Sequence, residues 1–279
     1  MTGQFFIYNN KFYPANFAVI SSGNRSLRYG DGLFETMKMV KDTIINKQFH
    51  FERLFHGLSL LQFEIPETFS PLFLEKKIKE IAAKNKHDNV TRIRLMLFRG
   101  EGGIFDPENL LPNYIIEAFS LPAKNQINQN GLEVEIFPDA KKSCDLFSNL
   151  KSNNYLPYVM AGLFAKKNKF DDCIVLNSFE RICDSAIANI FIIDGNNIYT
   201  PPLSEGCVAG VMRRWMLEKF DLKEYHVIEK KLSINDVLNA DEFFLTNSIS
   251  HLRWVKKFRD RNYNNKKVKE IYSHILQTM

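Results

Sequence analysis

The apolar residues of this chain follow two periodicities, and their alternation outlines a mixed α/β protein. Residues 5–14 and 34–48 place aromatic and β-branched residues on both sides of an Asn-Asn or Lys-Asp pair, which predicts two β-hairpins. Two stretches with helical apolar spacing follow, at 53–63 and 72–86. Two stretches with strand-like content come after them, at 90–98 and 114–121. We expect residues 1–122 to form one α/β domain.

A polar stretch at 123–131 contains turn residues and few apolar ones, so it predicts an interdomain linker. Residues 132–279 are expected to form a second, larger domain in which Ser233 and Asp236 have the spacing of a helix N-cap pair. Strands are expected at 132–137, 173–178, 188–194, 197–202 and 242–248, and helices at 154–170, from 209 onward and at 265–279. The predicted fold class is α/β, in two domains.

Composition narrows the class of protein and of partner. With 279 residues and 45% hydrophobic content, the chain can bury a substantial core. The net charge of +5 is spread without a basic block, so it indicates no nucleic-acid partner and suits a small anionic ligand. No stretch reaches the ~18 consecutive apolar residues of a membrane span, and no basic and apolar leader opens the sequence. The four cysteines lack metal-ligand spacing, so we expect no metal site and a cytoplasmic, reducing location.

Lys151 has the surroundings that point most directly to chemistry. It stands between an Asn/Ser-rich loop and an apolar run, just before a predicted helix. Desolvation there would favour the neutral amine, the form that attacks an aldehyde to build a Schiff base. A single lysine is more often a solvated surface charge, so this assignment depends on the rest of the sequence.

Seven segments, taken in order, resemble those of the class IV pyridoxal-phosphate enzymes. This family includes D-amino-acid aminotransferase, branched-chain aminotransferase and 4-amino-4-deoxychorismate lyase. Each segment is short, but their common order covers most of the chain. The segments are RYGDGLFETMKM (28–39), FERL (51–54), RGEGG (99–103), KSNNYLP (151–157), CDSAIANIF (183–191), SEGCVAGVMRRW (204–215) and EFFLTNS (242–248).

The resemblance implies a two-domain fold type IV enzyme that binds pyridoxal 5'-phosphate in the cleft between its domains, and a homodimer. Lys151 would carry the cofactor as a Schiff base and later move the substrate proton. The family places a glutamate opposite the ring nitrogen of the cofactor; here the matching position is Asp184, one methylene shorter. Taken without the resemblance, Asp184 is more readily interpreted as an aspartate of a hairpin.

The resemblance also assigns the remaining cofactor contacts and the substrate side. A helix start offers backbone amides to the phosphate, and an arginine supplies a fixed cation. Tyr155 would bond the phenolic oxygen of the cofactor, or is instead a core tyrosine. Phe34 and Glu35 would approach the cofactor or substrate. The phosphate ligands implied are Arg53, Gly210, Val211, Met212, Asn247 and Ser248.

Three features favour the lyase, which releases p-aminobenzoate and pyruvate from aminodeoxychorismate. They are RGEGG at 99–103, GVMR at 210–213 and Asn247 within a Thr-Asn pair. Two features count against the lyase: FETM at 34–37 resembles the aminotransferases more, and Ile104 replaces an arginine that some lyases carry after the RGEGG position. An amino-acid aminotransferase is therefore the alternative, and a non-catalytic cofactor-binding homologue is a further one.

A D-amino-acid specificity of the standard kind is disfavoured. The family's arginine and histidine that bind the substrate carboxylate correspond here to Ile104 and Asp106. Arg99 and Arg253 are other possible carboxylate ligands, although both positions also suit structural roles.

Overall fold

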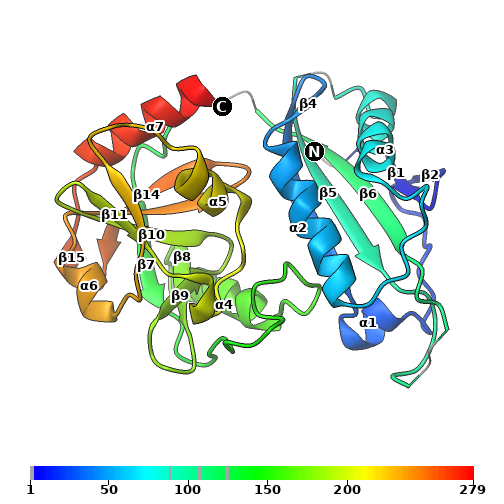
Figure 1. Cartoon of the computed structure of the whole chain (residues 1–279), viewed down its shortest axis with the longest axis horizontal. Coiled ribbons are helices and arrows are strands. Elements are labelled where there is room, and N and C mark those ends of the chain that lie inside the picture. Colours follow the sequence, from blue (N-terminus) through cyan, green and yellow to red (C-terminus); the bar gives the residue numbers. More distant parts are fainter. Residues whose placement is uncertain (1–2, 88, 106–107, 123–125) are drawn as a thin grey trace. The chain divides into compact units, whose positions relative to one another are not determined.

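The computed structural model describes residues 3–87, 89–105, 108–122 and 126–279. Two compact units make up the chain (Figure 1). The first comprises Met1–Lys124 and Leu150–Asn154, and the second comprises Asn125–Asn149 and Tyr155–Met279.

The change of unit after residue 124 falls within the stretch 123–131 that we interpreted as a linker. Residues 123–125 of that stretch lie outside the described residues. The return of Leu150–Asn154 to the first unit was not apparent from the sequence, because a contact between distant segments leaves no local periodicity.

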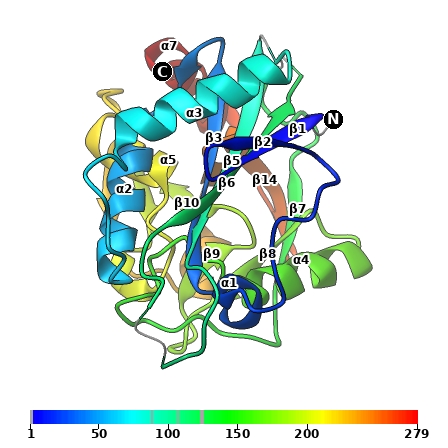
Figure 2. The same cartoon turned by 90° about the vertical axis from the view of Figure 1, so that its right-hand side faces the viewer.

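The described residues of the first unit form an antiparallel sheet of six strands in the order β2-β1-β6-β5-β3-β4 (Figures 1 and 2). Both predicted hairpins are present, and Asn9, Asn10 and Lys41 have the left-handed backbone that their tight turns require. The elements are β1 (Phe5–Tyr8), β2 (Lys11–Pro14), α1 (Arg25–Tyr29), β3 (Gly32–Val40), β4 (Thr43–Ile44), α2 (Lys47–Leu60), α3 (Pro71–Lys84), β5 (Val90–Phe98) and β6 (Asn113–Ser120).

The second hairpin is shorter than predicted, and the helix after it is longer. Strand β4 ends at Ile44, and α2 already begins at Lys47 instead of at residue 53. Asn46, with a φ of 53°, ends the extended backbone. Phe51 and Leu54 then bury on one helix face, and this packing overrides the β-branched content of the preceding residues.

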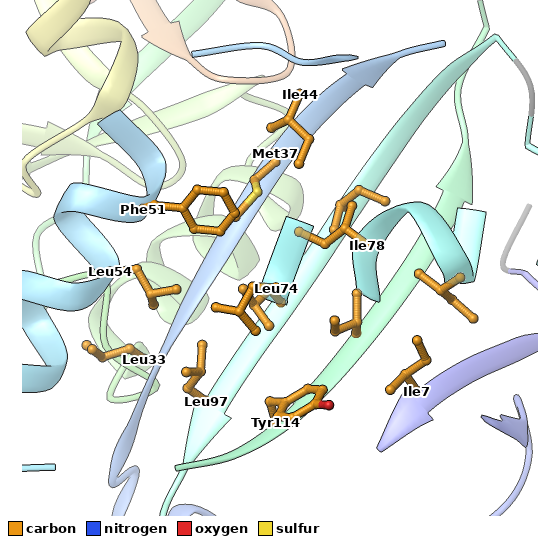
Figure 3. Close-up of a cluster of buried hydrophobic side chains, with 14 of the residues drawn as sticks. Ile7, Leu33, Met37, Ile44, Phe51, Leu54, Leu74, Ile78, Leu97 and Tyr114 are labelled. Carbon is orange, nitrogen blue, oxygen red and sulfur yellow. The ribbon is translucent and has the colours of Figure 1, made fainter. Parts of the chain in front are cut away.

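One apolar cluster covers one face of the first unit's sheet (Figure 3). Met37 of β3 and Leu95 of β5 pack there with Leu54 of α2 and Ile78 of α3. Burial of each such side chain contributes about 1.5–3 kcal/mol, so both helices are held on the same face. Because neighbouring strand residues point to opposite sides, the even-numbered positions of β3 and β5 face away from this cluster.

The described residues of the second unit form a mixed sheet in the order β12-β11-β10-β13-β14-β7-β8-β9, with β15 paired to β14. Strand β9 also pairs back with β10, which closes β10, β13, β14, β7, β8 and β9 into a ring. The closing register pair is Asp184 and Asn189. The strands are β7 (Leu132–Ile136), β8 (Asp172–Leu176), β9 (Ile182–Ser185), β10 (Asn189–Asp194), β11 (Asn197–Thr200), β12 (His226–Glu229), β13 (Glu242–Asn247), β14 (His251–Phe258) and β15 (Arg261–Asn262).

The helices of the second unit lie close to where the sequence places them. Ser233 and Asp236 form the predicted N-cap pair, with each side chain accepting a hydrogen bond from the other residue's backbone N–H. The helices are α4 (Leu156–Lys167), the 3-10 helix η1 (Leu203–Glu205), α5 (Val211–Glu218), α6 (Ile234–Asn239) and α7 (Lys266–Thr278). None of the described helices is both long and apolar enough to cross a bilayer.

Candidate active site

Lys151 lies in the short segment that returns to the first unit, alongside the beginning of β3. Its carbonyl accepts a hydrogen bond from Phe34 N–H at 2.9 Å, and Asn153 N–H donates to the Gly32 carbonyl at 2.9 Å. The side-chain amide of Asn153 also donates to the hydroxyl of Ser26 at 3.0 Å. Backbone pairing on both sides of Lys151 therefore holds this lysine against a strand.

The ring of Phe34 lies close to two cations of the first unit. Lys151 Nζ is 4.6 Å from the ring centroid, and the guanidinium carbon of Arg94 on β5 is also 4.6 Å from it. Phe34 is buried, and its expected approach to the cofactor or substrate stays a prediction. Sequence reasoning missed Arg94, although its signal was present: Arg92 and Arg94 alternate with the apolar positions of β5 and so must face away from the apolar cluster.

Glu35 points to the opposite face of β3 from Phe34, where α2 covers it. Its Oε1 accepts from Arg53 Nε at 2.8 Å, and its Oε2 accepts from Arg53 Nη2 at 2.5 Å. His50 Nδ1 lies 2.7 Å from the same Oε2. Burial alone would raise the pKa of Glu35, but the charges of Arg53 and His50 lower it to about 2. Glu35 is thus an anion that orients Arg53, the arginine that the resemblance assigns to the phosphate.

Asp184 lies at the ring closure of the second unit and is almost fully buried. Its Oδ2 accepts from Val208 N–H at 2.7 Å and from the Tyr158 hydroxyl at 2.8 Å, while Oδ1 accepts from Asn189 Nδ2 at 2.9 Å. Burial raises the pKa of Asp184 to about 6, and the charge of Lys142 and the three donors limit this rise. At neutral pH the site therefore holds a carboxylate shielded from water.

Gly210 is the N-cap residue of α5 and approaches the side chain that positions Asp184. A Cβ at residue 210 would overlap Asn189 Oδ1, while Asn189 Nδ2 donates to Asp184. Gly210 has no side chain with which to cap the helix, and the first turn of α5 begins directly after it at Val211 and Met212. The helix start and the buried carboxylate are therefore joined through Asn189.

Strand β13 ends in a turn at Asn247. Its Oδ1 accepts from Ile249 N–H at 3.0 Å and Ser250 N–H at 2.9 Å, so this oxygen stabilises the turn, and Ser248 within it is half-buried. Thr246 precedes the turn, pairs in register with Asn189, and is fully buried. Within the described part of the chain its hydroxyl has no hydrogen-bond partner, a costly arrangement that makes Thr246 a candidate ligand which the sequence did not single out.

Tyr155 is the N-cap residue of α4, and its ring packs on that of Tyr158 with centroids 4.4 Å apart. Residues three positions apart share one face of a helix, which explains the contact. The sequence singled out Tyr155 alone. It is Tyr158, however, whose hydroxyl bonds Asp184.

The other proposed carboxylate ligands lie in structural settings or on the surface. Arg99 is buried, with Nη1 bonded to Asp31 at 2.5 Å and its guanidinium carbon 4.2 Å from the Phe63 ring centroid. This arginine anchors the loops that it contacts. Ile104 is exposed, and Asp106 lies outside the described residues. Arg253 is a half-buried residue of β14.

Comparison with known proteins gives matches over nearly the whole chain. The model of the amino-transferase class IV family matches residues 32–258. Aminodeoxychorismate lyase of Vibrio harveyi is 30% identical over 81% of this chain and 83% of its own length. The putative branched-chain-amino-acid aminotransferase of Methanocaldococcus jannaschii is 26% identical over 94% of this chain and 91% of its own.

A solved structure shows the same fold. The branched-chain aminotransferase of the archaeon Thermoproteus uzoniensis, solved with norvaline, superposes with a TM-score of 0.87 at 19% identity, covering 99% of this chain and 94% of that chain. The α/β fold expected from the sequence, that of fold type IV, is therefore confirmed.

Proposed function

Because this chain belongs to the amino-transferase class IV family, it is a pyridoxal-phosphate-dependent enzyme, and we propose that it is a 4-amino-4-deoxychorismate lyase. The proposed reaction releases p-aminobenzoate and pyruvate and needs no keto-acid acceptor. The observation that carries the proposal is the guanidinium of Arg94 beside the Phe34 ring, together with the 30% identity to a lyase.

The face of the first unit's sheet opposite the apolar cluster suits a substrate with more than one carboxylate. Lys38, Arg92 and Arg94 occupy even-numbered positions of β3 and β5 on this face, and Glu117 is the register partner of Arg94 on β6. These positions therefore hold three basic side chains and one acidic side chain. Aminodeoxychorismate carries a ring, an amine and two carboxylates, so an aromatic side chain beside an arginine matches its chemistry. A branched-chain amino acid would need one carboxylate contact and an apolar surface.

The residues of the second unit fit the demands of the cofactor. A carboxylate has about four lone-pair sites, and among the described residues Asp184 uses three, which leaves one on Oδ1 for a protonated ring nitrogen. Gly210 and the start of α5 suit a phosphate group, and Arg53 is proposed as a further phosphate ligand. Thr246, which precedes Asn247 and Ser248, pairs in register with Asn189, the residue that Gly210 approaches.

Lys151 is the proposed catalytic residue. Pyridoxal phosphate supplies the electron sink that makes the substrate proton removable. The Lys151 amine binds the cofactor, takes the proton from the substrate carbon that bears the amine and returns it later. Arg94 binds a substrate carboxylate, and Phe34 supports the substrate ring. Tyr155 is proposed to bond the phenolic oxygen of the cofactor.

An amino-acid aminotransferase is the second candidate. The Methanocaldococcus jannaschii relative supports it, since that putative branched-chain enzyme aligns with 94% of this chain. The two reactions share their first proton transfer, and so the cofactor-binding residues suit either.

We also propose that the enzyme is a homodimer. Helix α4 carries an exposed apolar stripe at the spacing of one helix face, and exposed stripes of this kind mark interaction surfaces. A cytoplasmic location stays a further proposal, supported by four cysteines without metal-ligand spacing. The stripe residues are Leu156, Val159, Met160 and Leu163.

The deciding experiment measures p-aminobenzoate release from enzymatically generated aminodeoxychorismate, without added keto acid. The wild type should release product, and Lys151→Ala should lose both release and the visible absorbance of the bound cofactor. Lys76→Ala, at an exposed lysine of α3, is the matched control and should behave as the wild type. If the wild type retains cofactor but releases nothing, while branched-chain amino acids convert it to its amine form, the aminotransferase replaces the lyase.

A further inference from the structure

Tyr158 reaches the buried carboxylate of Asp184 from α4. The tyrosine is buried, and its hydroxyl donates to Asp184 Oδ2 at 2.8 Å. The same oxygen accepts from Val208 N–H at 2.7 Å, whereas Oδ1 accepts from Asn189 alone among the described residues. The two oxygens of Asp184 are therefore unequal, because two donors hold Oδ2 and one holds Oδ1.

The environment keeps Tyr158 a hydrogen-bond donor. Burial, followed by the charge of Asp184, raises the pKa of Tyr158 well above its ordinary value, so the hydroxyl stays protonated at every working pH. A hydroxyl that donates to a carboxylate favours the ionised form of that carboxylate. Tyr158 thus opposes the effect of burial on Asp184.

Few of the other titratable groups near Asp184 can keep its carboxylate ionised. Burial raises the pKa of the Cys183 and Cys207 thiols, so both stay neutral beside the carboxylate. Lys142 Nζ lies 5.0 Å from the centroid of the Tyr158 ring and donates to the Ser148 carbonyl at 2.9 Å. Lys142 contributes long-range charge, and Tyr158 contributes the direct side-chain hydroxyl.

We propose that Tyr158 is a positioning residue for the cofactor: by donating to Asp184 Oδ2, it keeps this carboxylate ionised and leaves Oδ1 for the ring nitrogen. The proposal rests on the role given to Asp184 under the proposed function. It also accounts for the shorter side chain at residue 184, because the Tyr158 hydroxyl already lies at hydrogen-bond distance, 2.8 Å, from Asp184 Oδ2.

The ring and the hydroxyl of Tyr158 have separable roles. The ring packs in an apolar cluster with Phe137, Ala161 and Val175, so removal of the whole side chain would open a cavity. Tyr158→Phe removes the hydroxyl alone. Tyr263→Phe is a matched control, because Tyr263 is also buried in the second unit and donates to the Val237 carbonyl at 2.7 Å, away from Asp184.

The first readout is the ionisation of Asp184 in the cofactor-free protein, followed by NMR of 13C-labelled aspartate carboxyls and assigned with Asp184→Asn. Loss of a hydrogen bond to a charged group should raise the pKa of Asp184 in Tyr158→Phe by about one unit, a tenfold change in ionisation. Tyr263→Phe should leave the titration at its wild-type position while lowering the melting temperature. An unchanged titration in Tyr158→Phe would overturn the proposal.

The second readout is the cofactor itself. Tyr158→Phe should bind pyridoxal phosphate about tenfold more weakly, and the acid limb of its kcat profile should move to higher pH. If Tyr158→Phe raised the pKa of Asp184 but kept the wild-type cofactor affinity and pH profile, the positioning role would also be overturned. The titration of Asp184 and the cofactor affinity remain measurable if the wild type releases no p-aminobenzoate, so failure of the lyase proposal is a separate result.

A double variant tests the spatial part of the argument. Asp184→Glu should weaken cofactor binding, because the added methylene meets the Tyr158 hydroxyl. Adding Tyr158→Phe to Asp184→Glu should restore affinity, so the two changes should be strongly non-additive. If the losses of cofactor affinity from the two single changes simply added, the extra methylene and the Tyr158 hydroxyl would not compete for the same space. This conclusion holds whatever the stability of Tyr158→Phe alone.

Discussion

Arg53 and Glu35 form a two-bond ion pair within the first unit, with distances of 2.8 Å and 2.5 Å between the guanidinium and the two carboxylate oxygens. Glu35 is fully buried, whereas Arg53 retains some exposure. Because Glu35 already fixes the planar guanidinium, Arg53 loses less conformational freedom when it binds a phosphate. The pair explains why an acidic residue lies so near the proposed cofactor arginine.

Glu35→Gln should therefore weaken cofactor binding without removing the Lys151 amine. We expect pyridoxal phosphate affinity to fall about 10-fold, because a charge-assisted bond to Arg53 is lost. Equilibrium titration of the cofactor-free protein by visible absorbance would measure this. Glu52→Gln, at an exposed glutamate of the same α2 helix, is the control. Equal affinities for Glu35→Gln and the wild type would show that the pair has no influence on the cofactor.

The pH dependence of stability should reveal the burial of Asp184. In the cofactor-free protein its pKa is raised from 3.8 to about 6, so the folded state binds this proton more tightly than the unfolded state. Its contribution is fully present below pH 3.8 and is lost as pH rises through about 6. The loss is about 3 kcal/mol.

Asp184→Asn should abolish this dependence, since the amide cannot ionise. Urea unfolding of the cofactor-free proteins at several pH values from acid to neutral would measure the difference in unfolding free energy. Asp260→Asn, at an exposed position of the same unit, should keep the wild-type curve. Parallel curves for Asp184→Asn and the wild type would be incompatible with a raised pKa.

Gly210→Ala should disturb the helix start and Asp184 together. The new Cβ would overlap Asn189 Oδ1, and Asn189 holds Asp184. We expect a loss of stability of about 1–3 kcal/mol and weaker cofactor binding. Gly162→Ala is the matched control: a Cβ there meets nothing within 4 Å, so the change within α4 should stabilise by up to about 1 kcal/mol. Calorimetry with and without cofactor separates the loss of stability from the loss of cofactor binding. Similar effects of Gly210→Ala and Gly162→Ala would contradict the role of Asn189.

Arg94→Gln should raise the substrate KM by about 10–100-fold, because a charged bond to a carboxylate is lost. Cofactor affinity should change little, since Arg94 lies beside Phe34 and away from the Arg53 pair. Steady-state kinetics together with cofactor titration separate the two effects. Arg259→Gln, at an exposed arginine, is the control. A KM equal to that of the wild type would remove Arg94 from the substrate site.

Met160→Glu combined with Leu163→Glu should convert the proposed dimer into a monomer. Two charges on the apolar stripe of α4 would have to be desolvated in an interface. Light scattering during size-exclusion chromatography measures the mass directly. Leu72→Glu, which alters a single highly exposed leucine of α3, should leave the mass unchanged. A double variant that stays dimeric would place the interface elsewhere.

Local patterns of sequence were enough to predict the hairpin at Asn9-Asn10, the capping pair of Ser233 and Asp236, and most strands of both units, although not β9, β12, β14 or β15. Each of these features depends on residues within a few positions of one another, so the amino-acid sequence is sufficient to predict it. The order of the seven segments likewise pointed to the family and to Lys151. It also marked Asp184 and the glycine before α5, because these positions follow a motif with fixed spacing.

Tertiary structure decided which partners these residues meet. Glu35 bonds Arg53 because α2 packs on one face of β3, and Phe34 meets Arg94 because the register of β3 with β5 brings them together. Tyr158 reaches Asp184 only after the second unit closes its ring of strands. Such contacts join residues far apart in sequence, and their geometry arises from burial and strand register, which no local spacing encodes.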